Sequence, residues 1–220
     1  DATPNDIYNG WIGQERMFKH LTEDFRYRGI DDPSVHFDEH IRNVIIGNYR
    51  NAFFRLSNSY ADQIAGLYQQ NQQLERLLSE GGAAADSAQS QLAANRTRAD
   101  ELRGKIQQLQ DFSEEKMPEA VVAKPMPLRM TELQMFSRAG MGDLLATRMQ
   151  SLVADALAEL EIYREAGEPM NPQMMPVRAC LIAVQFYAQN GQKAEAEALS
   201  DQLLNLTGQD WGRAIMQPRQ

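Results

Sequence analysis

The heptad pattern that follows Gly82 constrains the fold of this chain more than any other feature. Apolar residues and one Asn recur there in alternating steps of four and three, at Ala88, Leu92, Asn95, Ala99, Leu102, Ile106 and Leu109. This spacing is typical of a helix that packs along one seam against another helix. The positions outside the seam are rich in Gln, Arg and Glu, as on a solvated helix face.

A second helix is predicted immediately before this one. Asp38 is a good N-cap with acidic Glu39 in the first turn, and apolar residues then follow at spacings of three and four as far as Leu78. Gly81 and Gly82 break the pattern, and a break this short predicts an antiparallel hairpin. An ordinary pair of surface helices within one core is the alternative. The hairpin of about residues 70–112 is expected to project from the body of the protein. We therefore expect a variant that lacks residues 72–110 to keep the remaining helices folded.

The remaining segments complete an all-α prediction. Residues 1–37 are predicted to form a short helix and a loop, with a turn at Asp31-Asp32-Pro33. Helical patterns with Gly or Pro boundaries fill the C-terminal region, the third one starting at Asn171-Pro172. The predicted parts are an N-terminal short helix and loop at 1–37, a long helix and coiled-coil-like hairpin at 38–116, an extended Pro-rich connector at 117–127, and tetratricopeptide-like helices at 128–220.

A repeat signature lies near the C-terminus. Tyr187, Gly191 and Ala196 stand where a tetratricopeptide repeat places its aromatic residue, turn glycine and helix-packing alanine. Cys180, Ser200 and Leu203 depart from the repeat pattern, so that a plain helical hairpin is the alternative. The fold class predicted is therefore all-α, with helical hairpins of tetratricopeptide-like type and one long antiparallel coiled-coil-like hairpin.

A family resemblance covers the chain from Met17 to about Leu56 and continues weakly beyond. The run FRYRGIDDPSVHFDE at 25–39, followed by Arg42, by RNAF at 50–53 and by Arg55-Leu56, resembles the C-terminal region of a bacterial family of multi-spanning membrane proteins. These proteins are similar to the glycosyltransferase-C class and related to animal protein O-mannosyltransferases of the endoplasmic reticulum. The resemblance implies an extracytoplasmic location, an accessory role and no catalytic residue in this segment. The hairpin at about 70–112 departs from the family pattern.

Composition excludes some functions. A formal net charge of -8 disfavours a general nucleic-acid binder, because phosphate contacts need clustered Lys and Arg. No window approaches the roughly 20 apolar residues that cross a bilayer. Cys180 is the single cysteine, which excludes an internal disulfide. The chain begins at Asp1 without Met, and we expect it to be a processed chain or a segment of a longer protein.

Two groups of residues are candidates for a site. Arg42, Arg50 and Arg55 could clamp a phosphate or carboxylate, while pairing with Asp31 and Asp32 is the structural alternative. The run His36-Phe37-Asp38-Glu39-His40 matches an inverted zinc-peptidase pattern, which needs both imidazoles on one helical face. Because Asp38 is predicted to cap the helix, His36 would lie outside it. We therefore expect no metal, and no cofactor is predicted.

These observations predict a non-catalytic interaction domain. The first hypothesis is an extracytoplasmic accessory domain of a glycosyltransferase-like membrane protein that positions an acceptor or partner protein. The expected partner is a protein, the membrane part of its own parent chain being one candidate. The alternative is a free-standing tetratricopeptide and coiled-coil scaffold subunit, and a zinc hydrolase is the remote third hypothesis.

Overall fold

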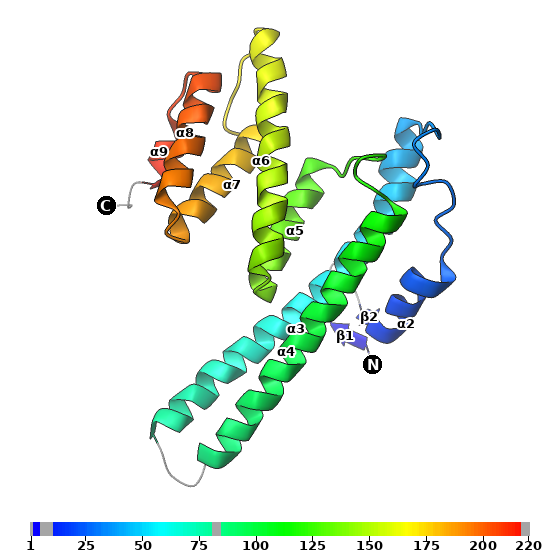
Figure 1. Cartoon of the computed structure of the whole chain (residues 1–220), viewed down its shortest axis with the longest axis vertical. Helices are drawn as coiled ribbons and strands as arrows, with labels where there is room; N and C mark the ends of the chain where they lie inside the picture. The colour runs from blue at the N-terminus through cyan, green and yellow to red at the C-terminus, as the bar shows by residue number, and fades with distance from the viewer. Residues whose placement is uncertain (1, 5–10, 81–84, 217–220) are drawn as a thin grey trace. The chain divides into compact units, whose positions relative to one another are not determined.

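The described chain is all-α apart from one short ribbon. The computed structural model describes residues 2–4, 11–80 and 85–216. They form two compact units, one made of Asp1–Lys124 and Gln134–Met141 and the other of Pro125–Leu133 and Gly142–Gln220. The boundary after Lys124 falls within the predicted connector, whereas residues 134–141 belong to the first unit although the sequence assigned them to the C-terminal region. Figure 1 shows the elements of both units in chain order.

The first unit begins with a ribbon that the sequence did not predict. Strands β1 (Ala2–Pro4) and β2 (Trp11–Gly13) pair antiparallel, with Thr3 opposite Ile12. Strands of three residues are too short to show an alternating pattern, which explains why the sequence did not reveal them. The predicted short helix follows as α2 (Gln14–Lys19) and the π-helical segment η1 (His20–Asp24). The loop after η1 is anchored by Tyr27, whose buried hydroxyl donates to the Leu21 carbonyl at 2.9 Å.

The predicted long helix is confirmed. It starts at Glu39, runs through the π-helical segment η2 (Ile41–Ile46) and continues as α3 (Gly47–Glu80). The carboxylate of Asp38 accepts the Ile41 N–H at 2.8 Å, which is the N-cap bond that the sequence predicted. The six-residue π segment carries no signal in the sequence. Such segments are rare and often occur at functional sites.

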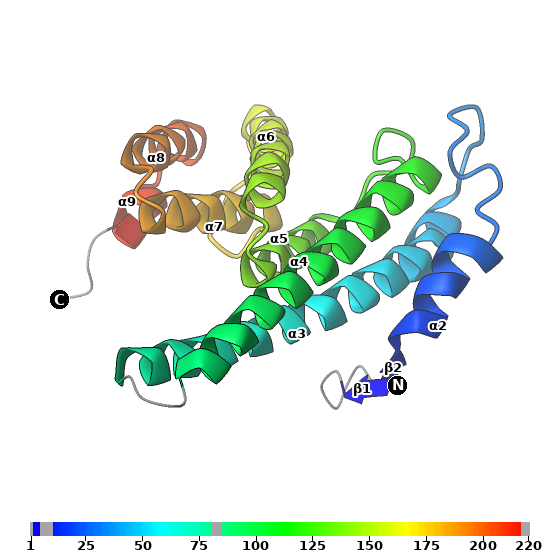
Figure 2. The same cartoon turned by 60° about the horizontal axis from the view of Figure 1, so that its bottom comes forward.

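The second arm of the hairpin is α4 (Ala85–Lys116), which lies antiparallel to α3 (Figures 1 and 2). The predicted glycine break at 81–82 lies outside the described residues. The predicted seam is confirmed, because its apolar members are all buried: Ala88, Leu92, Ala99, Leu102, Ile106 and Leu109. Asn95 donates from its side chain to the Asn71 side chain at 2.9 Å, which fixes the register between the two arms.

The structure contradicts the premise that residues 72–110 lie outside the core, while the outcome of their deletion stays a prediction. Leu102, Ile106 and Leu109 are 0% exposed and belong to the core of the first unit. Helix α3 packs against α4, and its residues Tyr60 and Ile64 are buried to a similar degree. A heptad pattern shows that a seam exists but does not show which part of it is also covered by other segments. Only the end of the hairpin beyond Asn71 and Asn95 is a candidate for removal.

The predicted extended connector is a compact turn. The Pro118 carbonyl accepts the N–H groups of Val121 and Val122 at 3.0 and 2.9 Å. Helix α5 (Met126–Ala139) starts soon after the turn, and the boundary between the two units passes through this helix.

The second unit contains stacked antiparallel helices of the tetratricopeptide-like type. After α5 come α6 (Gly142–Glu165), α7 (Met175–Gln189), α8 (Lys193–Thr207) and α9 (Trp211–Met216). Helix α7 packs against α6, α8 and α9. It therefore carries a largely buried face, formed by Pro176, Val177, Ala179, Cys180, Ala183 and Val184.

Two boundaries in this unit differ from the sequence prediction. Helix α7 starts at Met175 with Pro176 in its first turn, not at Asn171-Pro172. Asn171 instead closes a local turn, because its side-chain oxygen accepts the Gln173 N–H at 2.9 Å. Helix α9 was not predicted. It approaches α8 closely, since a Cβ atom on Gly212 would lie 2.5 Å from the Ser200 hydroxyl oxygen.

Candidate functional site

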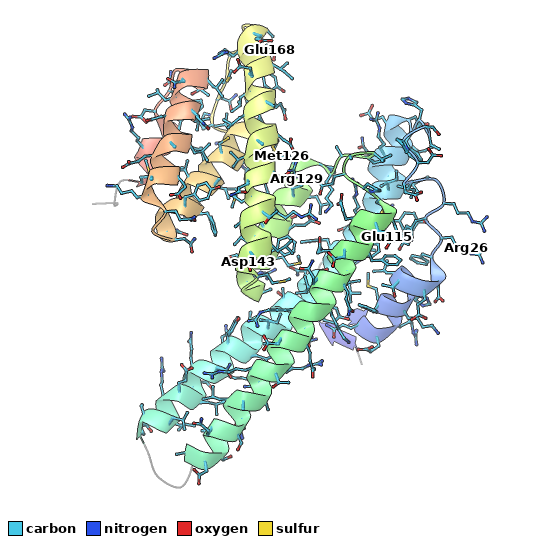
Figure 3. All side chains as sticks on the ribbon, viewed as in Figure 1. Arg26, Glu115, Met126, Arg129, Asp143 and Glu168 are labelled. Carbon is cyan, nitrogen blue, oxygen red and sulfur yellow. The ribbon has the colours of Figure 1, made fainter. Side chains whose placement is uncertain are left out.

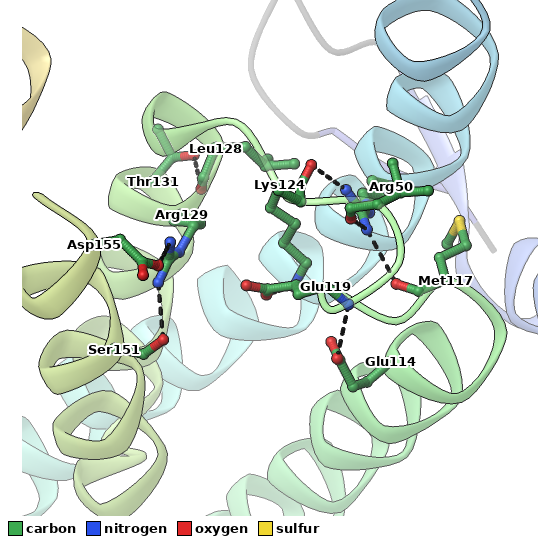
Figure 4. Close-up of polar contacts among 12 residues, drawn as sticks. Arg50, Glu114, Met117, Glu119, Lys124, Leu128, Arg129, Thr131, Ser151 and Asp155 are labelled. Carbon is green, nitrogen blue, oxygen red and sulfur yellow. Dashed lines mark hydrogen bonds and ion pairs between the residues drawn. The ribbon is translucent and has the colours of Figure 1, made fainter. Parts of the chain in front are cut away.

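Arg50 is the most deeply buried of the three candidate arginines, with 3% of its surface exposed. Its guanidinium group donates to the main-chain carbonyls of Met117, Val122 and Ala123, at 3.0 Å for Met117 and 2.9 Å for Ala123 (Figure 4). A guanidinium group presents five donors in a rigid fork, which suits a cluster of carbonyl oxygens as well as an anion. In this structure Arg50 therefore holds the turn that follows α4.

The same turn contains further buried charges. The side chain of Lys124 is 3% exposed and its ammonium group lies 3.2 Å from the Glu119 carboxylate. The Glu119 N–H donates to the Glu114 carboxylate at 3.0 Å. These contacts bind the turn to the end of α4, as Figure 4 shows. The polar groups at this place support the local fold.

The other two arginines differ from Arg50 in their surroundings. Arg42 is exposed and Arg55 is half-buried. Asp32, one of the predicted acidic partners, accepts the N–H and the hydroxyl of Ser34 at 2.8 and 2.7 Å. These bonds hold the pKa of the Asp32 carboxyl below its ordinary value. Anion binding by Arg42 and Arg55 stays a prediction.

The repeat signature lies at the turn between α7 and α8. Gly191 has a φ of +75°, which favours glycine, and the Gln192 N–H donates to the Tyr187 carbonyl at 2.9 Å. Ala196 is 0% exposed. Tyr187 is half-buried, and burial raises its pKa, with a further contribution from Glu195. The signature residues thus end one helix and pack the next.

The histidine pattern is divided by the start of the long helix. His36 precedes Asp38, the N-cap, whereas His40 lies inside the helix. Within residues 2–4, 11–80 and 85–216, no three His, Cys, Asp or Glu side chains gather in a way that could hold a metal ion. In the same ranges no helix has the length and apolar character needed to cross a bilayer.

Four exposed apolar side chains between residues 25 and 45 were not predicted from the sequence. They are Phe25, Val35, Val44 and Ile45, which are 45%, 40%, 44% and 47% exposed. We call this set the 25–45 surface. Phe25 packs edge-on against Tyr49, with 6.0 Å between ring centroids, and Tyr49 lies about one turn after Ile45.

A signal for this surface was present in the sequence. Val44, Ile45 and Ile46 are consecutive, and three consecutive residues span roughly 200° around a helix, which is more than one buried face can cover. Only Ile46 is buried, at 1% exposed. Arg26, next to Phe25, is exposed and its side chain points away from the helices in Figure 3.

Comparisons with known proteins give no further guide to the site. No protein-family model, curated protein or solved structure matches this chain.

Proposed function

We propose that this chain is a non-catalytic accessory domain on the extracytoplasmic side of a glycosyltransferase-like membrane protein, and that it positions an acceptor or partner protein. The 25–45 surface is the observation that carries the proposal. All four of its side chains are apolar and at least 40% exposed. We infer that they form one patch, and exposed apolar patches mark interaction sites.

The occupant of this surface is a loop of the multi-spanning membrane protein. Support comes from the position of the surface in the sequence, because residues 25–45 overlap the run 25–39 and Arg42 that resemble the membrane-protein family. Arg26, Arg28 and Arg42 are exposed neighbours of the apolar residues in the sequence and supply donors for loop carboxylates and carbonyls. An apolar centre with a polar rim is the usual organisation of a protein interface.

The helical pairs of the second unit supply the part that holds a partner protein. Helices α7 and α8 each bury one face against neighbouring helices, as repeat units do where they stack. Arg50, the deepest candidate residue, supports the turn after α4. Its role is consistent with a binding domain.

Site-specific photo-cross-linking in native membranes tests the proposal. A photoreactive amino acid at Ile45 should cross-link to an extracytoplasmic loop of the membrane protein, whereas the same group at Ile162, which is 66% exposed in the second unit, should not. An Ile45→Asp substitution should reduce recovery of the complex by roughly tenfold, because an apolar side chain of this size contributes about 1.5–3 kcal/mol when buried. Ile162→Asp is the matched control.

Two results would contradict the proposal. Equal cross-linking from Ile45 and Ile162 would show that the 25–45 surface has no specific partner. A coding region that places only a signal peptide before Asp1, with no hydrophobic spans in the chain or in a co-purifying protein, would favour the free-standing scaffold instead.

A further inference from the structure

The hairpin of α3 and α4 has two unlike flanks. With Asn71 opposite Asn95, antiparallel pairing sets Leu74 opposite Leu92 and Leu78 opposite Ala88. On one flank, side chains cross from arm to arm. Glu75 lies 3.9 Å from Arg96, and the Arg103 guanidinium group donates to the Tyr68 hydroxyl. That flank is closed by these polar contacts and, near the base, by the end of α5, whose Ala139 carbonyl accepts from Arg103 at 2.8 Å.

The other flank is covered by a helix near the base of the hairpin. Gln14 of α2 donates to the Ser59 hydroxyl at 2.9 Å and accepts from the Gln63 amide at 2.8 Å. Glu15 lies 2.7 Å from the Lys105 ammonium group, which holds the pKa of that carboxyl below its ordinary value. This flank therefore accepts a third helix beside the two arms.

Beyond α2, none of the other described helices of the first unit covers the same flank towards the tip. Residues seven apart in a heptad pattern lie on the same flank of a helix. On α3 this flank therefore continues from Gln63 to Gln70 and Leu77. On α4 it continues from Lys105 to Arg98 and Gln91. A groove of about 290 Å³ lies there, lined by Gln70, Gln73, Leu74, Leu77, Gln91 and Asn95. Leu77 is 43% exposed at its edge. The groove thus continues an interface that the protein already uses for its own helix.

Five of the six residues that line the groove lie in stretches without charges. Residues 63–74 of α3 and 87–95 of α4 contain no Asp, Glu, Lys or Arg, and Leu77 alone lies outside them. Two copies of a chain with a net charge of -8 repel each other, so that a neutral surface is where they can approach most closely. Glutamine side chains both donate and accept hydrogen bonds, which makes a surface of amides and leucines complementary to itself.

Charges at the two ends of the groove match a two-fold arrangement. Arg98 lies six residues from Leu92 towards the base, whereas Asp86 lies six residues from Leu92 towards the tip. Glu80 lies six residues from Leu74, also towards the tip. Two hairpins related by a two-fold axis at the level of Leu74 and Leu92 would bring Arg98 of each copy level with Glu80 and Asp86 of the other.

We propose that the occupant of this groove is a second copy of the chain. The tips of two hairpins pack antiparallel into a four-helix arrangement, in which Leu77 of each copy enters the groove of the other. Arg98 then pairs with Glu80 and Asp86 across the interface. Arg98 is available for this, since it is exposed and its ion pair with Glu101, at 2.9 Å, lies on its own helix.

Sedimentation velocity over a concentration series tests the interface. The chain should show a monomer–dimer equilibrium, and Leu77→Lys should weaken the dimer at least roughly tenfold, because each copy loses a buried leucine. Gln72→Lys adds the same charge at an exposed position of α3 that does not line the groove, and should change the dimer constant little. Circular dichroism verifies that each variant is folded.

Charge reversal distinguishes this arrangement from any other dimer. Arg98→Glu alone and the double variant Glu80→Lys, Asp86→Lys alone should each dimerise less than the unaltered chain. An equal mixture of the two should recover dimers, since every cross-interface pair is then of opposite sign. A chain that stays monomeric at all concentrations, a dimer insensitive to Leu77→Lys, or a mixture without recovery would each overturn the proposal. None of these results bears on the 25–45 surface.

Discussion

Replacement of Arg50 by Met tests whether one buried guanidinium group holds the turn after α4. Methionine keeps most of the aliphatic volume and removes the hydrogen-bond donors. The carbonyls of Met117, Val122 and Ala123 would then lose the donors that they share on Arg50. Because Arg50 is 3% exposed, solvent replaces those donors poorly.

The expected loss of stability is large. A hydrogen bond from a charged donor contributes about 1.5–3 kcal/mol, and a buried polar group left without a partner costs about 1–3 kcal/mol. Removing the guanidinium group also ends the cost of burying its charge, and the turn can relax towards water. We therefore expect Arg50→Met to lower the free energy of unfolding by roughly 3–5 kcal/mol, as when one partner of a buried charged network is removed.

Urea unfolding followed by circular dichroism measures the loss, and hydrogen exchange locates it. The amides of Val121 and Val122, which donate to Pro118, should exchange faster in the variant. Arg42→Met is the matched control, because Arg42 is exposed on the same long helix and should change stability by less than about 0.5 kcal/mol. A loss below about 1 kcal/mol for Arg50→Met, with both amides still protected, would refute the reasoning.

Three further predictions concern the second unit. Gly191→Val should destabilise it by roughly 1–2 kcal/mol, because a branched residue resists the φ of +75° at that turn; an unchanged melting temperature would contradict this. Gly212→Ala should cost roughly 1–3 kcal/mol, because the added Cβ atom would lie 2.5 Å from the Ser200 hydroxyl oxygen, and protection of α9 from hydrogen exchange reports the result. Burial raises the pKa of the Cys180 thiol to about 12, so that a thiol reagent at pH 7 or pH 9 should react only on unfolding; rapid reaction of the native chain would show that α7 is exposed.

Local patterns in the sequence predicted the features that depend on neighbours along the chain. Alternating steps of four and three predicted the seam of α4, since the helical period alone decides which residues share a face. Asp38 was predicted as an N-cap because its carboxylate reaches an N–H only three residues ahead. Gly191 was predicted as a turn glycine because its φ depends mainly on its lack of a Cβ atom. Cap, seam and turn all follow from local geometry.

The features that the sequence left open depend on residues far apart in the chain. Arg50 lies 67 residues from Met117, and no short pattern predicts that this guanidinium group would hold a turn rather than an anion or an acidic loop. In the same way, Gln14 covers one flank of the hairpin from 45 residues before Ser59. The sequence therefore determined that the longer helices form and which of their faces are apolar, because these properties follow from neighbours within a few turns. Only the tertiary structure decided which part of the seam is core, which arginine is buried, and which apolar residues stay exposed, because burial depends on what the rest of the chain packs against.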